Sequence, residues 1–233
     1  MISRAFAAAL SFVMLQPLLL GAQNISVDEA AFRIYLNGQV VGREEFSIRQ
    51  IGPVAEQRTI LRGTVGLTLP GGAVNLAPAM DVQGGTLAVS DYQIKVSGAE
   101  STDIFVTVSG NRYLARIVSA SGEQLREFRA GSGSILLDDW VVHHHHLLTP
   151  FLEGGSPVSL TVLSPRAVRQ QRMTLSLVGQ EEIRVAGVLV PDARRFHLEG
   201  GDGSRDIWFD SQGRILRVEI PSQGYVAERE SMT

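Results

Sequence analysis

Four consecutive histidines, His143 to His146, are the residues of this chain whose type most directly suggests chemistry. Imidazole is a common ligand of zinc, copper and nickel, so the run could hold a metal ion. On a helix, residues share a face at spacings of three or four, and within the run only His143 and His146 meet that condition. We therefore expect His144 to be a core histidine with solvated neighbours. A metal site at His143 and His146 is the alternative.

Motifs of the common enzyme classes are absent from the sequence. It contains no Gly-x-Ser-x-Gly nucleophile elbow, no phosphate-binding Gly-x-x-x-x-Gly-Lys loop and no dinucleotide-binding glycine fingerprint. The chain has no cysteine, which excludes thiolate metal sites and cysteine nucleophiles. Adjacent acids such as Asp138 and Asp139 would point to opposite faces of a strand and would not form an acid/base pair. The sequence favours a non-enzymatic protein, with no catalytic residue and no cofactor predicted.

The composition bounds the class of protein. The chain has 233 residues, 44% of them hydrophobic, which suits one sizeable globular domain. Its 21 Lys and Arg residues are balanced by 24 Asp and Glu residues, giving a net charge of −3. Nucleic-acid binding usually needs a clustered basic face, so we predict no nucleic-acid partner.

The first 22 residues have the composition of a targeting segment. Arg4 precedes an apolar run that Gln16 and Pro17 interrupt, and small residues follow at Gly21 and Ala22. This order is typical of a cleaved secretory signal, and the run is too short for a transmembrane anchor. We predict a signal peptide over residues 1–22, cleavage near Ala22, a periplasmic or secreted protein and no transmembrane segment in residues 23–233.

Alternating apolar and polar residues dominate the remainder and predict roughly 11–14 short strands. Asn37-Gly38 lies between two such runs, which is the strongest short signal for a β-hairpin. The alternation slips once near Ser90-Asp91, so a β-bulge is expected there.

One segment has helical instead of alternating spacing. Its stripe predicts an α-helix near residues 138–152 with an acidic N-cap at Asp138 or Asp139. The stripe consists of Trp140, His144, Leu147, Leu148 and Phe151. A lone helix in a β-rich chain is best placed against the apolar face of one sheet. We predict a mostly β fold in which a curved antiparallel sheet, a half-barrel, wraps around this helix as a single domain.

Three short motifs carry a resemblance to known proteins. They are Tyr-Leu-Asn-Gly at 35–38, Asp-Ile-Trp-Phe-Asp at 206–210 and Gly-Arg-Ile-Leu-Arg-Val-Glu at 213–219. With these motifs the chain resembles uncharacterised exported bacterial domain-of-unknown-function families whose fold is similar to the lipoprotein carriers LolA and LolB. The resemblance implies a half-barrel with an apolar interior, and no catalytic residues.

The leading functional hypothesis is an apolar ligand, such as a lipid, held in the concave sheet, because such concavities usually bind something. The first alternative is an envelope scaffold or interaction module with a filled core and an envelope protein as partner. The second is a metalloprotein or enzyme that uses the histidine run. The residues predicted to line the groove are Leu61, Val65, Leu67, Ile94, Val106, Trp140, His144, Phe151, Leu175 and Val185.

Overall fold

The structure is a computed structural model that describes residues 24–53, 56–85, 87–98, 101–155 and 157–232. The predicted signal peptide, residues 1–22, and its cleavage site near Ala22 lie outside the described residues. Within the described ranges, no helix has both the length and the apolar character needed to cross a bilayer.

One sheet of fifteen strands runs through the described residues. Strands β1 to β8 form an antiparallel meander, β10 to β15 form a second, and β1 pairs with β15 to join the two. The strands are β1 (Asn24–Leu36), β2 (Gln39–Ile51), β3 (Arg58–Leu69), β4 (Gly72–Gln83), β5 (Ala88–Gly98), β6 (Thr102–Ser109), β7 (Arg112–Ser119), β8 (Gly122–Arg129), β9 (Ser134–Leu136), β10 (Val158–Ser164), β11 (Arg169–Val185), β12 (Val188–Glu199), β13 (Arg205–Phe209), β14 (Ile215–Ile220) and β15 (Tyr225–Arg229).

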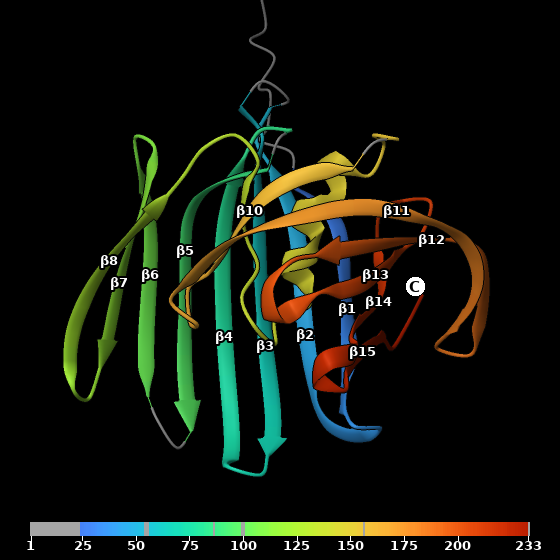
Figure 1. Ribbon diagram of the computed structural model, residues 1–233, viewed down its shortest axis with the longest axis horizontal. Helices are drawn as coiled ribbons and strands as arrows, with labels where there is room; N and C mark the ends of the chain where they lie inside the picture. The colour runs from blue at the N-terminus through green and yellow to red at the C-terminus, as the bar shows by residue number, and fades with distance from the viewer. Residues whose placement is uncertain (1–23, 54–55, 86, 99–100, 156, 233) are drawn as a thin grey trace, which may run out of the picture.

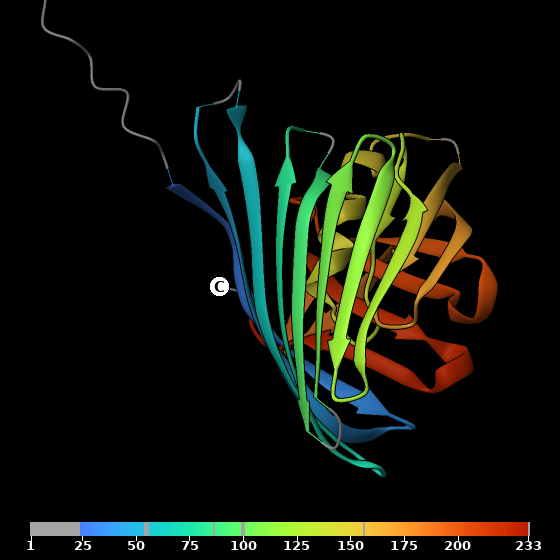
Figure 2. The same cartoon turned by 90° about the vertical axis from the view of Figure 1, so that its left-hand side faces the viewer.

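The sheet curls into a nearly closed barrel around a helical segment. In Figure 1 the strands of the first meander stand behind, β10 to β13 cross in front of them, and the helical segment lies between the two. Figure 2 shows the same enclosure from the side. The strand order begins with β8 and ends with β9, so these two edges form a seam without a ladder. The mostly β fold and the half-barrel description are therefore confirmed in outline.

Two local predictions about the strands are confirmed. Asn37 and Gly38 connect β1 to β2 with φ values of 50° and 77°, the left-handed conformation that a tight hairpin turn requires. Between β4 and β5, Asp81 pairs with Asp91 while Val82 pairs with Val89, so Ser90 is the extra residue of a bulge. The bulge restores the inward direction of the side chains that follow it.

The expected α-helix near residues 138–152 is wrong in type and extent. The structure has a 3-10 helix, η2, over His143–Phe151, with Pro150 inside it. A 3-10 helix has three residues per turn, and successive residues on it reach all sides of the axis. Because the barrel surrounds η2, side chains on several faces are buried, among them His143, His144, His145, Leu147 and Leu148. The sequence pattern, interpreted with a 3.6-residue period, predicted only one buried face.

The sequence led us to expect a sheet that is antiparallel throughout, and this expectation is wrong for one pair of strands. Strand β9 lies parallel to β10, with Ile135 opposite Val162. The connection between them contains η2, so the helix is threaded across the inside of the barrel between two neighbouring strands. The two short 3-10 helices η3 (Gly201–Gly203) and η4 (Pro221–Gln223) are loop elements between strands.

The junction of the two meanders is held by a buried ion pair. Phe32 of β1 pairs with Arg229 of β15 in the ladder. The Arg229 guanidinium, 1% exposed, donates to the Asp28 carboxylate at 3.0 Å and to the Ile215 carbonyl at 3.2 Å. The first and last strands of the described chain are thus connected by both a ladder and a side-chain pair.

Candidate functional site

The structure brings together nearly all residues that the sequence predicted to line a groove. Six strand residues belong to the main core: Leu61, Val65, Leu67, Ile94, Val106 and Leu175. His144 of η2 is buried as well. Trp140 and Phe151 are partly buried and pack against this core. Val185 does not join them, because it lies in a separate small cluster with Ala193, Trp208 and Leu216.

The predicted groove is filled by the chain itself. The six strand residues of the main core are at most 3% exposed, and His144 is 0% exposed. A side chain facing an open groove or an internal space large enough for water would retain accessible surface. These residues instead form one continuous core with Leu147 and Leu148 of η2, which are themselves fully buried.

Glu44 is the residue that anchors η2 to the barrel wall. It lies on the inward face of β2, in the same alternating series as Phe46 and Ile48, and is 0% exposed. Its carboxylate accepts hydrogen bonds from the backbone amides of Val142, at 2.6 Å, and His143, at 3.2 Å, and also pairs with His143 Nδ1. The first N–H groups of a helix have no partner within it, so Glu44, a residue of β2, caps the N-terminal end of η2. The predicted caps, Asp138 and Asp139, make no such contact.

Asp138 organises the segment that leads into η2. Its carboxylate accepts from the Tyr92 hydroxyl at 2.8 Å and from the backbone amides of Asp139 and Arg166, and its own backbone amide donates to His144 Nδ1 at 3.2 Å. Burial raises the pKa of Asp138 to about 6. Since His144 Nδ1 accepts, the ring proton lies on Nε2, and burial holds the His144 pKa well below its ordinary value.

His145 bonds in a different direction from its neighbours. Its Nδ1 donates to the Val142 carbonyl at 2.8 Å, and its Nε2 accepts from Arg205 Nη1 at 3.3 Å. Burial and the Arg205 charge lower the pKa of His145 to about 3, so the ring is neutral. The expectation of one core histidine with solvated neighbours is therefore wrong: His143, His144 and His145 are all buried, and His146 is half-buried.

The alternative metal site at His143 and His146 finds no further ligands. Among the residues that the structure describes, no group of three or more His, Asp or Glu side chains is placed to hold a metal ion. His143 instead packs against Gly63 of β3, where an added Cβ would lie 2.7 Å from His143 Cε1. The absence of a side chain on β3 makes room for the imidazole.

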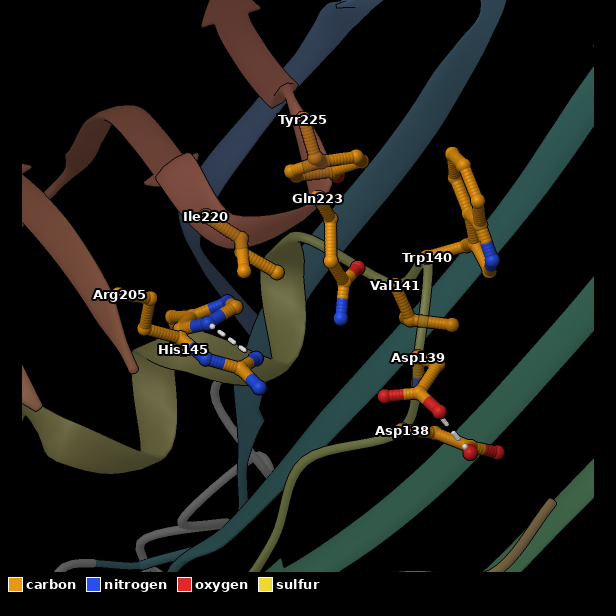
Figure 3. A pocket seen from close by; sticks show the side chains of 9 residues that line it. All are labelled: Asp138, Asp139, Trp140, Val141, His145, Arg205, Ile220, Gln223 and Tyr225. Atoms are coloured by element: carbon orange, nitrogen blue, oxygen red, sulfur yellow. Dashed lines mark hydrogen bonds between the residues drawn. The ribbon is translucent and has the colours of Figure 1, made fainter. Parts of the chain in front are cut away.

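A small polar cavity lies where η2 meets β13 and β15 (Figure 3). Its volume is about 80 Å³. The Arg205 and His145 side chains lie on one side, Asp139 and Trp140 on the other, and Tyr225 and Gln223 between them. Trp140 and Tyr225 meet edge to face, with ring centroids 5.3 Å apart. The cavity reaches the buried histidines through His145, and it is lined by Asp138, Asp139, Trp140, Val141, His145, Arg205, Ile220, Gln223 and Tyr225.

Comparison with known proteins identifies a shared fold. No protein-family model and no curated protein matches the chain. Among solved structures it is similar to a beta-barrel-like protein of domain of unknown function DUF1849 from Brucella abortus, with a TM-score of 0.54 and 9% sequence identity over 86% of this chain and 93% of that one. The fold is β-barrel-like. This likeness supports the predicted resemblance to a domain of unknown function. Similarity to the lipoprotein carriers stays a prediction.

Proposed function

We propose that this protein is an exported, non-enzymatic interaction module whose barrel is filled by its own residues. The observation that carries the proposal is the burial of the predicted groove beneath η2. This favours the filled-core alternative over the hypothesis of an apolar ligand in the concave sheet. The β-barrel-like fold is itself consistent with a binding role.

An apolar ligand could occupy the barrel only if η2 left it. Leu147 and Leu148 are 0% exposed, and exposing a leucine costs about 1.5–3 kcal/mol. The departure of η2 would also break the hydrogen bonds that the backbone amides of Val142 and His143 donate to Glu44. The Glu44 carboxylate would then be buried without a partner. A lipid would have to compensate for all of these contacts before it gained any affinity.

The non-enzymatic part of the proposal is supported by the partners of the histidines. His143 is paired with Glu44, His144 accepts from the Asp138 amide, and His145 is bonded to Val142 and Arg205. These bonds hold η2 in place inside the barrel, so the three rings have a structural role. With pKa values held low by burial, His144 and His145 are also poor proton acceptors near neutral pH.

A surface for a protein partner lies on the outer face of β6 to β8. Leu125 is 69% exposed and Leu114 is 38% exposed, and Phe105 lies beside them with Arg116 over its ring at 4.5 Å. These side chains line a hollow of about 340 Å³. Strand β8 is also an edge of the sheet, and Gln170 occupies its outer backbone groups at Arg129, so a partner would pair with the stretch before Arg129. Exposed apolar groups beside a free edge are typical of protein docking sites.

Site-specific photo-cross-linking in the native host tests the proposal. A photoreactive residue in place of Leu125 should capture one defined protein, and the same probe in place of Val40, which is 60% exposed in the β1–β2 hairpin, should not. Capture must recur in the reciprocal experiment with a probe in the identified partner. Equal capture at both positions, or a stoichiometric lipid in intact-mass spectra of the purified protein, would overturn the interaction module.

Export is tested separately by cell fractionation. We expect the mature protein in the periplasm or the medium, with an intact mass that starts near Gln23. Full-length protein confined to the cytoplasm would contradict the export part of the proposal and leave the interaction surface to the cross-linking result.

A further inference from the structure

The cavity at the N-terminal end of η2 contains two opposite charges that do not pair with each other. The Arg205 guanidinium is 4% exposed and donates only to uncharged acceptors, the Gly203 carbonyl at 2.9 Å and His145 Nε2 at 3.3 Å. Within the part of the chain that the structure describes, it forms no ion pair. Asp139 lines the other side of the cavity, and its carboxylate likewise has no hydrogen bond or ion pair among the described residues.

Arg205 is a buried charge without an ion pair, which is costly, whereas Asp139 is partly buried, so the position of Arg205 calls for an explanation. Burial lowers the pKa of Arg205, and the Asp139 carboxylate acts in the opposite direction. The two groups therefore interact through space without touching. The cavity of about 80 Å³ lies between them, and its size suits a few non-hydrogen atoms and excludes an acyl chain.

The wall of the cavity beside Asp139 is aromatic. Trp140 and Tyr225 meet edge to face there. Trp140 also has a φ of 67°, a left-handed conformation that is strained for a bulky residue. Strain of this kind persists where the surrounding structure holds a side chain in place for a purpose. Aromatic rings next to a carboxylate form a favourable environment for an ammonium group.

We propose that this cavity binds a small zwitterion, with its carboxylate or phosphate on Arg205 and its ammonium group against Asp139, Trp140 and Tyr225. Such a ligand neutralises both unpaired charges at once. A simple anion would leave Asp139 unpaired and would be repelled by it, and a simple cation would do the same at Arg205. The proposal goes beyond the interaction module and does not depend on it, because it concerns the cavity beside η2 rather than the outer face of β6 to β8.

Two sources could supply this chemistry, a free solute such as a betaine or the headgroup of a zwitterionic phospholipid. Isothermal titration of the full-length mature protein with glycine betaine, acetate and tetramethylammonium separates the zwitterion from its two halves. Titration with phosphatidylcholine vesicles provides the lipid arm. We expect glycine betaine or the vesicles to bind at least tenfold more tightly than acetate or tetramethylammonium, with a change in Trp140 fluorescence.

Two variants connect binding to the charges. Asp139→Asn keeps the shape of a partly buried side chain and should weaken binding at least tenfold, whereas Asp192→Asn, at an exposed position of β12, should not change it. Arg205→Gln should weaken binding in the same way, and circular dichroism verifies that it folds. The proposal is overturned if acetate binds as tightly as the zwitterions, if Asp139→Asn binds like the parent chain, or if neither glycine betaine nor the vesicles bind.

Discussion

Glu44 and His143 lie 99 positions apart in the sequence, and their side chains are paired inside the barrel. Because the same carboxylate also accepts from the backbone amides of Val142 and His143, one strand residue fixes both the position and the orientation of η2. Both side chains are 0% exposed, so this contact is shielded from water. The η2 helix is therefore held by a directional polar contact as well as by apolar packing.

Replacing Glu44 by alanine should be strongly destabilising. The substitution leaves two backbone amides and the His143 ring unpaired in the core, for which we expect a loss of about 3–5 kcal/mol in the free energy of unfolding. Urea denaturation followed by circular dichroism measures this loss. Glu45→Ala is the matched control, because the Glu45 side chain is 63% exposed and its loss should cost less than about 1 kcal/mol. Similar losses for the two variants would show that the buried contact does not stabilise the fold.

Gly63→Ala should also be destabilising, for a steric reason. Its Cβ would lie 2.7 Å from His143 Cε1, so the imidazole or the strand must shift, at a cost of about 1–3 kcal/mol. Gly66→Ala on the same strand is the control, since its Cβ would meet only Asn75 Oδ1, at 3.6 Å. Because His143→Ala removes the steric conflict, the loss in the Gly63→Ala/His143→Ala double variant should be smaller than the sum of the two single losses. Additive losses would show that the two positions are not coupled.

Acidification should destabilise the protein between about pH 6.5 and pH 4. His144 and His145 have depressed pKa values in the folded state, about 3 for His145, so their contribution is present above 6.5 and is lost as protons bind the unfolded chain. Asp138 acts in the opposite sense: its raised pKa, about 6, gives a contribution that is present below 3.8 and is lost as the pH rises through 6. His146, whose pKa burial lowers to about 4, acts in the same sense as the other two. Three histidines outweigh one carboxyl, so the free energy of unfolding should fall on acidification.

Urea denaturation at pH 7 and at pH 4.5 measures this fall, which we expect to be about 1–3 kcal/mol. In the Asp138→Asn variant the opposing contribution is absent, and the fall between the two pH values should be larger than in the parent protein. A free energy of unfolding that rises on acidification would contradict the assignment of neutral, buried histidines.

The seam between the sheet edges should loosen when Gln170 is replaced. The Gln170 amide accepts from the Arg129 backbone N–H at 3.0 Å and donates to the Arg129 carbonyl at 2.6 Å, so it takes the place of a ladder partner for β8. We expect Gln170→Ala to speed hydrogen exchange at Arg129 at least several-fold. Gln171→Ala is the control, since the Gln171 side chain contacts Met173 within its own strand. Unchanged exchange at Arg129 would show that the bridge is not formed in solution.

The features predicted correctly from sequence are those that local chemistry determines. The Asn37-Gly38 turn and the Ser90 bulge follow from backbone conformation and from a period of two. Strand β4 contains Pro78, a residue that argues against a central strand, yet Pro78 is buried opposite a stretch of β3 where the ladder has a gap. A proline is tolerated where no ladder bond is needed, and this depends on a partner strand that the sequence does not reveal.

The candidate site was less predictable because its parts come from distant strands. Glu44 did carry a signal, since it occupies an inward position in a series with Phe46 and Ile48. A charged residue in an apolar series points to a buried partner. Arg205 and Tyr225 carried no comparable signal, because their relation to His145 and Trp140 exists only after the second meander folds against η2.

The pairing of β1 with β15 has a consequence for the synthesis of the chain. Phe32 cannot meet Arg229 until the chain has been synthesised beyond residue 229 and that stretch has left the ribosome. Until then, the inner face of the meander β1 to β8 is not covered by the second meander, and η2 is not fully enclosed. Closure of the sheet is therefore delayed until β15 has emerged, and contacts of such long range make folding slow. A nascent chain of this kind stays unfolded, and so narrow enough to pass through a pore, for longer than one that folds as it emerges.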